Sequence, residues 1–243
     1  MNSIEIKNLS KNYGEVKALD NVSFEIKEGE IFGLLGTNGA GKTTLIKIIS
    51  SLTKATSGDV LVYGNSINKE AQKIKEIVDI SPQETSIAPN LTVMENLKFF
   101  ANIYYREKED IDNKINEIIE IFSLNEVIEK KAKTLSGGYQ RRLSIALALI
   151  SNPKIILLDE PTLGLDVIAR RQLWNILNKL KDKITIVLTS HYLEEIEFLC
   201  KRVAIMSHGK IVTLGTIEEI VENSNEKSFE DAFIKIVESG EEI

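Results

Sequence analysis

The sequence predicts an α/β fold, in which a core carries an N-terminal antiparallel β-subdomain and is interrupted by an inserted α-helical subdomain. Alternating polar and apolar residues, continuous apolar runs and a long stretch of amphipathic helical patterns support this prediction. We expect a single domain over residues 1–243. Its parts are the core with the β-subdomain (1–85 and 151–220), the helical subdomain (86–150) and a C-terminal helical tail (221–243).

The first part of the chain reads as strands and short helices. Apolar residues at alternate positions of 4–6 and 22–26 indicate half-buried antiparallel strands. Residues 31–35 are apolar throughout, as in a strand covered on both faces, and a glycine-rich loop follows them. The further elements expected here are a helix at 43–52, a strand at 59–63, a helix at 69–77, a strand at 78–80 and a loop at 81–83.

Helical patterns dominate the middle of the chain. Thr92 and Glu95 match a capping box, which starts a helix, and isoleucines at 111, 115 and 118 keep one apolar face of another. Buried strands are expected again at 155–158 and 184–188, with a helix at 169–180 between them.

The last part of the chain is expected to hold a hairpin and a helix. Strands at 203–206 and 211–214 flank a turn, where His208 is expected to be solvated. Ser228 and Asp231 cap a final amphipathic helix, and Trp174 on the preceding helical segment is expected to pack.

Composition narrows the possible partners and the compartment. The net charge is −6 with both signs interspersed, which argues against binding nucleic acid. Cys200 is the only cysteine, so an intrachain disulfide is impossible and a reducing compartment is indicated; we expect it to be a small apolar residue. No segment resembles a signal peptide, and no apolar run approaches the ~20 residues that span a bilayer. Any membrane role is therefore expected to need a separate subunit.

A phosphate-binding loop follows the buried strand at 31–35. The pattern G-x-x-x-x-G-K-[ST] is formed by Gly36, Thr37, Asn38, Gly39, Ala40, Gly41, Lys42 and Thr43, and Thr44 continues it into a helix. Glycines let backbone N–H groups converge on phosphate oxygens, and Lys42 would reach the β and γ phosphates. Thr43 would place its hydroxyl on Mg²⁺. An ordinary glycine-rich turn is the alternative.

Two acids follow the strand at 155–158. Because side chains alternate along an extended chain, Asp159 and Glu160 point in different directions and can take different roles. We expect Asp159 to hold Mg²⁺, directly or through water, and Glu160 to polarise an attacking water. A solvated loop is the alternative for such paired acids.

A second glycine-rich segment at the start of a helix has no metal site of its own. Ser136 is a suitable N-cap, and Gly137 and Gly138 expose the first N–H groups of a helix, so this segment is a second candidate anion site. Two such helix starts with one metal site suggest a nucleotide held between two subunits. A plain capped helix is the alternative.

The phosphate loop, Leu135 to Gly138 and Leu157-Leu158-Asp159-Glu160-Pro161, in this order and spacing, resemble the nucleotide-binding subunits of ATP-binding cassette (ABC) transporters. The resemblance covers essentially the whole chain. It implies a P-loop NTPase fold with a RecA-like core, ATP and Mg²⁺ as cofactors, and an ATPase that converts ATP and water to ADP and phosphate in order to drive transport.

The resemblance also implies roles for four further residues. Tyr13 matches the aromatic residue that stacks on adenine, and Gln83 matches the loop glutamine that senses the metal and the membrane subunit. Asp166 matches the acid of the inter-subunit loop, and His191 matches the switch histidine at the γ-phosphate. The expected catalytic residues are thus Lys42, Gln83, Glu160 and His191, and the expected metal ligands are Thr43, Gln83 and Asp159.

One position departs from the family pattern. Tyr139 stands where glutamine is commonest, and Gln140 comes one place later, which puts in doubt only the contact made by this fifth position.

The expected partners are a second ABC ATPase subunit, identical or closely related, and an integral membrane permease; no nucleic acid is expected. Two subunits would close head to tail around two Mg·ATP. The chain would be cytoplasmic and peripheral on the inner face of the membrane, bound through the permease. Its motifs look most like those of bacterial exporters of drugs, antibiotics or lipids. The ATPase of an importer and a soluble, non-transport ABC ATPase are the alternatives.

Overall fold

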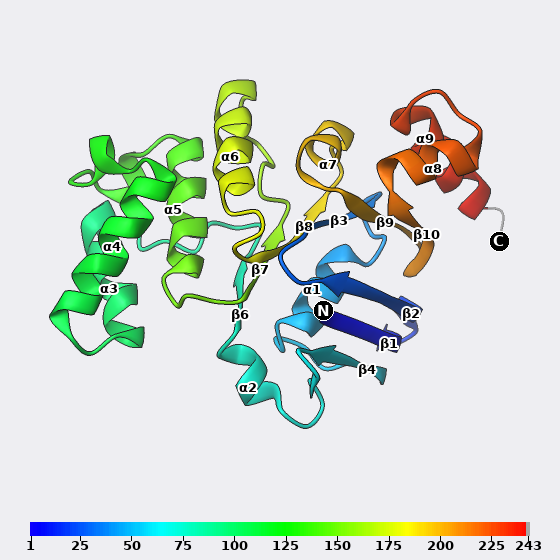
Figure 1. Ribbon diagram of the computed structural model, residues 1–243, viewed down its shortest axis with the longest axis horizontal. Helices are drawn as coiled ribbons and strands as arrows, with labels where there is room; N and C mark the ends of the chain where they lie inside the picture. Colours follow the sequence, from blue (N-terminus) through cyan, green and yellow to red (C-terminus); the bar gives the residue numbers. More distant parts are fainter. Residues whose placement is uncertain (242–243) are drawn as a thin grey trace.

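The computed structural model describes residues 1–241 and contains two sheets that lie next to each other, with helices around them (Figure 1). The predicted α/β fold is confirmed. The smaller sheet has the strand order β2-β1-β4-β5 and is antiparallel throughout. Its strands are β1 (Asn2–Tyr13), β2 (Val16–Lys27), β4 (Ser57–Val62) and β5 (Asn65–Ser66).

The larger sheet has the order β10-β9-β3-β8-β7-β6 and is parallel except for the last strand, β10, at one edge. Its strands are β3 (Ile31–Gly36), β6 (Val78–Ser81), β7 (Ile155–Asp159), β8 (Thr185–Ser190), β9 (Arg202–Ser207) and β10 (Lys210–Thr216). The carboxyl ends of the parallel strands meet at one edge of this sheet, which is where ligand sites form in open α/β sheets.

The helices fall into groups along the chain. α3, α4 and α5 lie together at one end of the molecule, and α8 and α9 lie at the other (Figure 1). The helices are α1 (Lys42–Ile49), α2 (Ala71–Lys75), α3 (Val93–Tyr104), α4 (Lys108–Phe122), α5 (Gly137–Leu149), α6 (Val167–Lys179), α7 (Leu193–Leu199), α8 (Ile217–Ser224) and α9 (Phe229–Glu241), with two short 3₁₀ turns, η1 (Asn125–Val127) and η2 (Ala132–Thr134).

Both faces of the larger sheet are covered, which explains its continuous apolar runs. Ile156 and Leu158 on β7 face a core shared with α5 and α6. Leu157, between them, faces the opposite core, which α1 and the antiparallel sheet complete. Because side chains alternate along a strand, every residue of such a run is buried, on one side or the other. α1 is clamped between the two sheets, and this position holds the loop before it in place.

Most predicted elements are confirmed, with shifted ends. The expected helix at 43–52 stops at Ile49, because Ser51 adopts a left-handed backbone with φ 59°. The helix expected from 169 begins at Val167, because the Asp166 carboxylate caps it by accepting a bond from the backbone N–H of Ala169 at 2.9 Å. The capping boxes at Thr92 and the cap at Ser228 are present as predicted.

Some elements were not recognised from the sequence. α8 is one of them, although Thr216 and Glu219 form a capping box at its start. Cys200 and Trp174 are both buried in the core, which confirms that they are packing residues. Of the helices in residues 1–241, none combines the length and the apolar character that crossing a bilayer requires.

Candidate active site at the carboxyl ends of the central strands

The phosphate loop joins β3 to α1 in a tight turn. The backbone N–H of Ala40 donates to the carbonyl of Thr37 at 3.2 Å, and Gly39 and Gly41 have φ values of 83° and 103°, which favour glycine. A Cβ at Gly41 would lie 2.5 Å from the carbonyl oxygen of Ala18, so this position also excludes larger residues by contact. The loop is therefore held against β2 as well as against α1.

Lys42 is folded over the loop. Its Nζ donates to the carbonyl oxygens of Gly36 at 2.7 Å and Thr37 at 3.2 Å and lies 3.6 Å from Oε1 of Glu160. The side chain is only 6% exposed. Burial lowers the pKa of Lys42, and the carboxylate of Glu160 opposes this shift. A cation is thus held at the centre of the loop, where it can meet phosphate oxygens.

Oxygen atoms gather beside the loop at the end of β7. The Thr43 hydroxyl donates to Oδ1 of Asp159 at 3.1 Å, and the Thr189 hydroxyl donates to the same oxygen at 2.6 Å. Thr189 also accepts a bond from the backbone N–H of Glu160 at 2.9 Å, so one side chain holds both acidic residues in place.

This donor set fits Mg²⁺. Mg²⁺ prefers oxygen ligands and is usually held by one or two carboxylates together with substrate phosphates. Thr43 and Asp159 supply a hydroxyl and a carboxylate. Thr43 and Asp159 would therefore hold the ion, which would neutralise negative charge on the phosphates when bound.

Glu160 points away from Asp159, towards the loop lysine and the histidine after β8. Its Oε2 lies 2.6 Å from Nδ1 of His191, and its side chain is buried. Glu160 also has a left-handed backbone, with φ 47°, which is rare for a residue with a side chain. Lys42, Glu160 and His191, from three separate segments, are thereby linked in one cluster.

These residues line a cavity of about 550 Å³, a size typical of small-molecule sites. The cavity brings together most of the predicted site: Asn38, Gly39, Ala40, Gly41, Lys42, Thr43, Thr44, Gln83, Glu160 and His191. Residues that the sequence analysis did not assign to it complete the lining: Val16, Lys17, Ala18, Leu163 and His208.

The remaining predicted residues lie outside the lining of this cavity. Tyr13 ends β1 directly opposite Val16, which lines the cavity, and its ring is half exposed. Ser136 is the N-cap residue of α5 as predicted, yet its hydroxyl makes no capping bond. Asp166 caps α6 and is exposed. The second glycine-rich helix start is thus not part of the pocket formed by its own chain.

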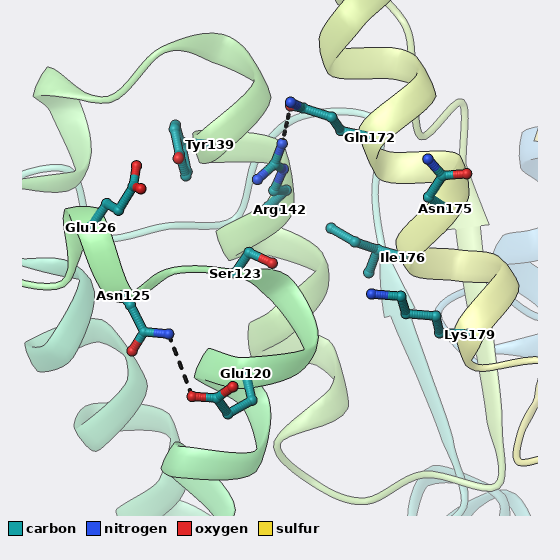
Figure 2. A pocket seen from close by; sticks show the side chains of 10 residues that line it. All are labelled: Glu120, Ser123, Asn125, Glu126, Tyr139, Arg142, Gln172, Asn175, Ile176 and Lys179. Atoms are coloured by element: carbon teal, nitrogen blue, oxygen red, sulfur yellow. Dashed lines mark hydrogen bonds between the residues drawn. The ribbon is translucent and has the colours of Figure 1, made fainter.

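Gly138 faces α6, whereas Tyr139 lies beside Arg142. A Cβ at Gly138 would lie 2.9 Å from Cβ of Ala169, so the glycine permits close approach of α5 and α6. Figure 2 shows Tyr139 in a different cavity, of about 500 Å³, between the end of α4, α5 and α6. There the guanidinium of Arg142 lies 4.9 Å from the centre of the Tyr139 ring and is hydrogen-bonded to Gln172.

Besides the wall residues Val16, Lys17, Ala18 and Leu163, the sequence analysis did not assign Thr189, Arg141 or His208 to the site. Thr189 belongs to no short motif, so only the fold reveals its role. Arg141 lies in the glycine-rich segment that begins at Leu135, but its bonds to carbonyl oxygens around the site are visible only in the structure. His208 is exposed in its turn, as expected, but it also lines the cavity, because the backbone N–H of Gly209 donates to the carbonyl of Ala40 at 3.1 Å. The sequence analysis predicts the hairpin that carries His208 but does not place it beside the phosphate loop.

Comparison with known proteins agrees with this geometry. The profile of the family described as "ABC transporter" matches residues 19–163. The linearmycin resistance ATP-binding protein LnrL of Bacillus subtilis (strain 168) is 39% identical over 214 residues, which are 88% of this chain and 69% of LnrL. The probable multidrug ABC transporter ATP-binding protein YbhF of Escherichia coli (strain K12) is 36% identical over 240 residues, 96% of this chain but only 41% of YbhF.

A solved structure shares the fold over most of the chain. The dimeric ATP-binding cassette MJ0796 in a post-hydrolysis state, bound to ADP and Pi, has a TM-score of 0.78 and 31% identity, and the match covers 88% of this chain and 98% of MJ0796. The matched family profile, the relatives and the arrangement of the phosphate loop, Asp159, Glu160 and His191 lead to one conclusion. The chain belongs to the ABC transporter family, as one of its cassettes that bind Mg²⁺ and ATP and hydrolyse ATP.

Proposed function

We propose that two copies of this chain, or one copy and a close relative, close head to tail around two Mg·ATP and so drive a separate membrane subunit. In each site the phosphate loop of one copy faces Ser136, Gly137 and Gly138 of the other. The observation that carries the proposal is the placement of this helix start: the Ser136 side chain does not cap it, and it lies outside the lining of its own chain's phosphate cavity. The first N–H groups of a helix are suited to bind an anion. The dimeric structure of MJ0796 with ADP and Pi supports the pairing of two cassettes.

Within each site, Lys42 binds the β and γ phosphates, and Thr43, Asp159 and Gln83 hold Mg²⁺. Glu160 accepts the proton of the attacking water, and His191, 2.6 Å from its Oε2, keeps that carboxylate in place and contacts the γ-phosphate. Tyr13 stacks on adenine, beside Val16 in the cavity wall. Asp166 contributes to the surface between the two copies.

The motion follows from these contacts. ATP joins two surfaces that each carry part of its site, and hydrolysis weakens the joint, so binding closes the dimer and phosphate release opens it. Residues 86–150, which follow the Gln83 loop, move as a subdomain and transmit the opening to an integral membrane permease. The same proposal has the chain in the cytoplasm, bound to the inner face of the membrane through the permease.

Export is the direction that we propose. LnrL is named for resistance to linearmycin and YbhF as a probable multidrug transporter protein, and both are similar to this chain over most of its length. Purifying the tagged chain from solubilised membranes tests this assignment. An integral membrane partner is expected; an additional substrate-binding protein would indicate an importer, and a purely soluble complex would indicate a non-transport ATPase.

A complementation experiment tests the shared site. The variant Lys42→Ala impairs a phosphate loop, and the variant Ser136→Arg impairs the opposite face, so each variant alone is expected to be inactive. In a mixed head-to-tail dimer, both defects meet in one site and the other site is intact. An equal mixture makes half of the dimers mixed, so roughly one quarter of the wild-type ATPase rate is expected to return.

Two measurements complete this test. Glu160→Gln is expected to trap a dimer with ATP, as seen by sedimentation, whereas the exposed Glu197→Gln on α7 is the matched control and should behave as wild type. If mixing the two inactive variants restores no activity, or if a strictly monomeric preparation hydrolyses ATP at full rate, the shared site is wrong.

A further inference from the structure

Arg141 is buried in α5, one turn after the glycines at the start of this helix, and its side chain is only 4% exposed. Its guanidinium group donates hydrogen bonds to four main-chain carbonyl oxygens. Nε donates to Pro161 at 2.8 Å, Nη2 to Asp159 at 2.9 Å, and Nη1 to Pro82 at 2.5 Å and Gln83 at 3.1 Å.

The four carbonyl groups come from two different segments. Pro82 and Gln83 lie in the loop after β6, and Asp159 and Pro161 lie at the end of β7. A planar guanidinium has its five N–H groups in a rigid fork, so it can hold several acceptors in fixed directions at once. One side chain of α5 therefore fixes the backbone of both segments relative to each other and to the helix.

The charge of Arg141 is held without an ion pair. Among the side chains of residues 1–239, no carboxylate oxygen forms an ion pair with Arg141, although Asp159, Glu195 and Glu160 act on it at longer range. Burial lowers the pKa of Arg141 to about 10, so the group is still a cation at neutral pH. A buried cation is stabilised here by carbonyl dipoles, and the carbonyl groups in turn depend on it for hydrogen bonds.

Asp159 and Gln83, whose carbonyl oxygens accept bonds from Arg141, are also predicted ligands of Mg²⁺. The carbonyl of Asp159 is fixed by Arg141 while its carboxylate accepts the Thr43 hydroxyl, and the Gln83 side chain lines the same cavity. The helix that carries Arg141 begins with the segment that faces the second copy in the proposed dimer. A shift of α5 on closure would therefore reach both segments through one group.

We propose that Arg141 is a positioning residue that couples the start of α5 to the Gln83 loop and to Asp159, so that contact with the second copy's nucleotide sets the geometry of the metal site in its own chain. This inference rests on the proposed dimer. It predicts that the loss of the fork impairs catalysis and Mg²⁺ use more than nucleotide binding.

The test compares two neighbouring buried arginines. Arg141→Lys keeps the positive charge and loses the fork; the matched control, Arg142→Lys, makes the same change one residue later, where the partners are Gln172 and Tyr139. Arg141→Lys is expected to lower kcat about tenfold, the effect of about one lost charge-assisted bond, and to raise the Mg²⁺ concentration for half-maximal activity severalfold. The affinity for a fluorescent ADP analogue in EDTA is expected to stay within about twofold of wild type.

Arg142→Lys is expected to leave both kcat and the Mg²⁺ requirement within about twofold of wild type, whatever it does to stability. Equal effects of the two variants, or an effect of Arg141→Lys on nucleotide affinity alone, would overturn the inference. An inactive wild-type protein would instead contradict the proposed function, which separates the two failures.

A second measurement does not depend on any Arg141 variant folding. Hydrogen exchange is followed in Glu160→Gln with and without ATP. The backbone amides at 83–86, at 160–163 and in the first turn of α5 are expected to gain protection together. Protection of α5 without a change in the other two segments would show that they are not coupled, and the inference would be wrong.

Discussion

Replacing Thr189 by valine tests whether one hydroxyl holds the two acids of the site. Valine has nearly the shape of threonine, so the change removes the hydroxyl without opening a large space in the buried strand β8. Two bonds are lost: the 2.6 Å bond to the carboxylate of Asp159 and the 2.9 Å bond from the backbone N–H of Glu160.

The expected magnitude follows from these two bonds. A hydrogen bond to a charged group contributes about 1.5–3 kcal/mol, and a buried N–H without a partner costs about 1–3 kcal/mol. The free energy of unfolding should therefore fall by about 3–5 kcal/mol. If the energy of the first bond is needed to keep the Asp159 carboxylate in its productive place, kcat should fall about 10-fold to 100-fold, because about 1.4 kcal/mol corresponds to a factor of ten.

Thr185 provides the matched control on the same strand. It is buried at the opposite end of β8 from the site acids, and its hydroxyl accepts the backbone N–H of Gly29 at 3.0 Å. Thr185→Val should cost about 1 kcal/mol of stability and leave kcat unchanged, and Thr189→Ser should recover most of the lost activity. Stability is measured by denaturant unfolding and kcat by phosphate release. A Thr189→Val protein with kcat within about twofold of wild type would refute the reasoning.

Two further predictions concern buried groups behind the site. Burial raises the pKa of Glu195, which accepts a bond from Trp174 Nε1 at 2.9 Å, so its contribution to stability is present at low pH and is lost as pH rises above about 4.3, the pKa of an unfolded glutamate. Glu195→Gln should therefore remove part of the fall in unfolding free energy between acidic and neutral pH, and an unchanged pH dependence would contradict this. Burial also raises the pKa of the Cys200 thiol well above its ordinary value, so maleimide labelling should be slow in the native protein and fast in denaturant; rapid native labelling would show that the thiol is accessible.

The parts of the site that lie in continuous motifs could be predicted from the sequence, and the parts that depend on packing could not. The phosphate loop is a run of eight residues whose backbone does the binding, so its composition alone indicates phosphate. Arg141 contacts residues up to 59 positions away, and no local pattern announces such a contact. The same holds for Thr189, which reaches Asp159 only because β7 and β8 are neighbours in the sheet.

Element ends were predictable only where a side chain caps them. Thr92 and Glu95 mark the start of α3 in the sequence, and the structure has the same capping box. The end of α1 depends instead on the left-handed backbone of Ser51, and the sequence around Ser51 does not predict this conformation. The orientation of Tyr139, which faces Arg142, depends on the packing of α5 against α4 and α6 and could not be predicted from a single position.

The backbone of Glu160 has a consequence for engineering. Left-handed φ costs a residue with a side chain about 1–2 kcal/mol, and glycine escapes most of this cost. A selection for heat resistance alone would thus be drawn towards glycine at the position whose carboxylate faces Lys42 and His191. Thermostabilised libraries of this protein should therefore be screened for turnover as well as for folding, since robustness and turnover conflict at this residue.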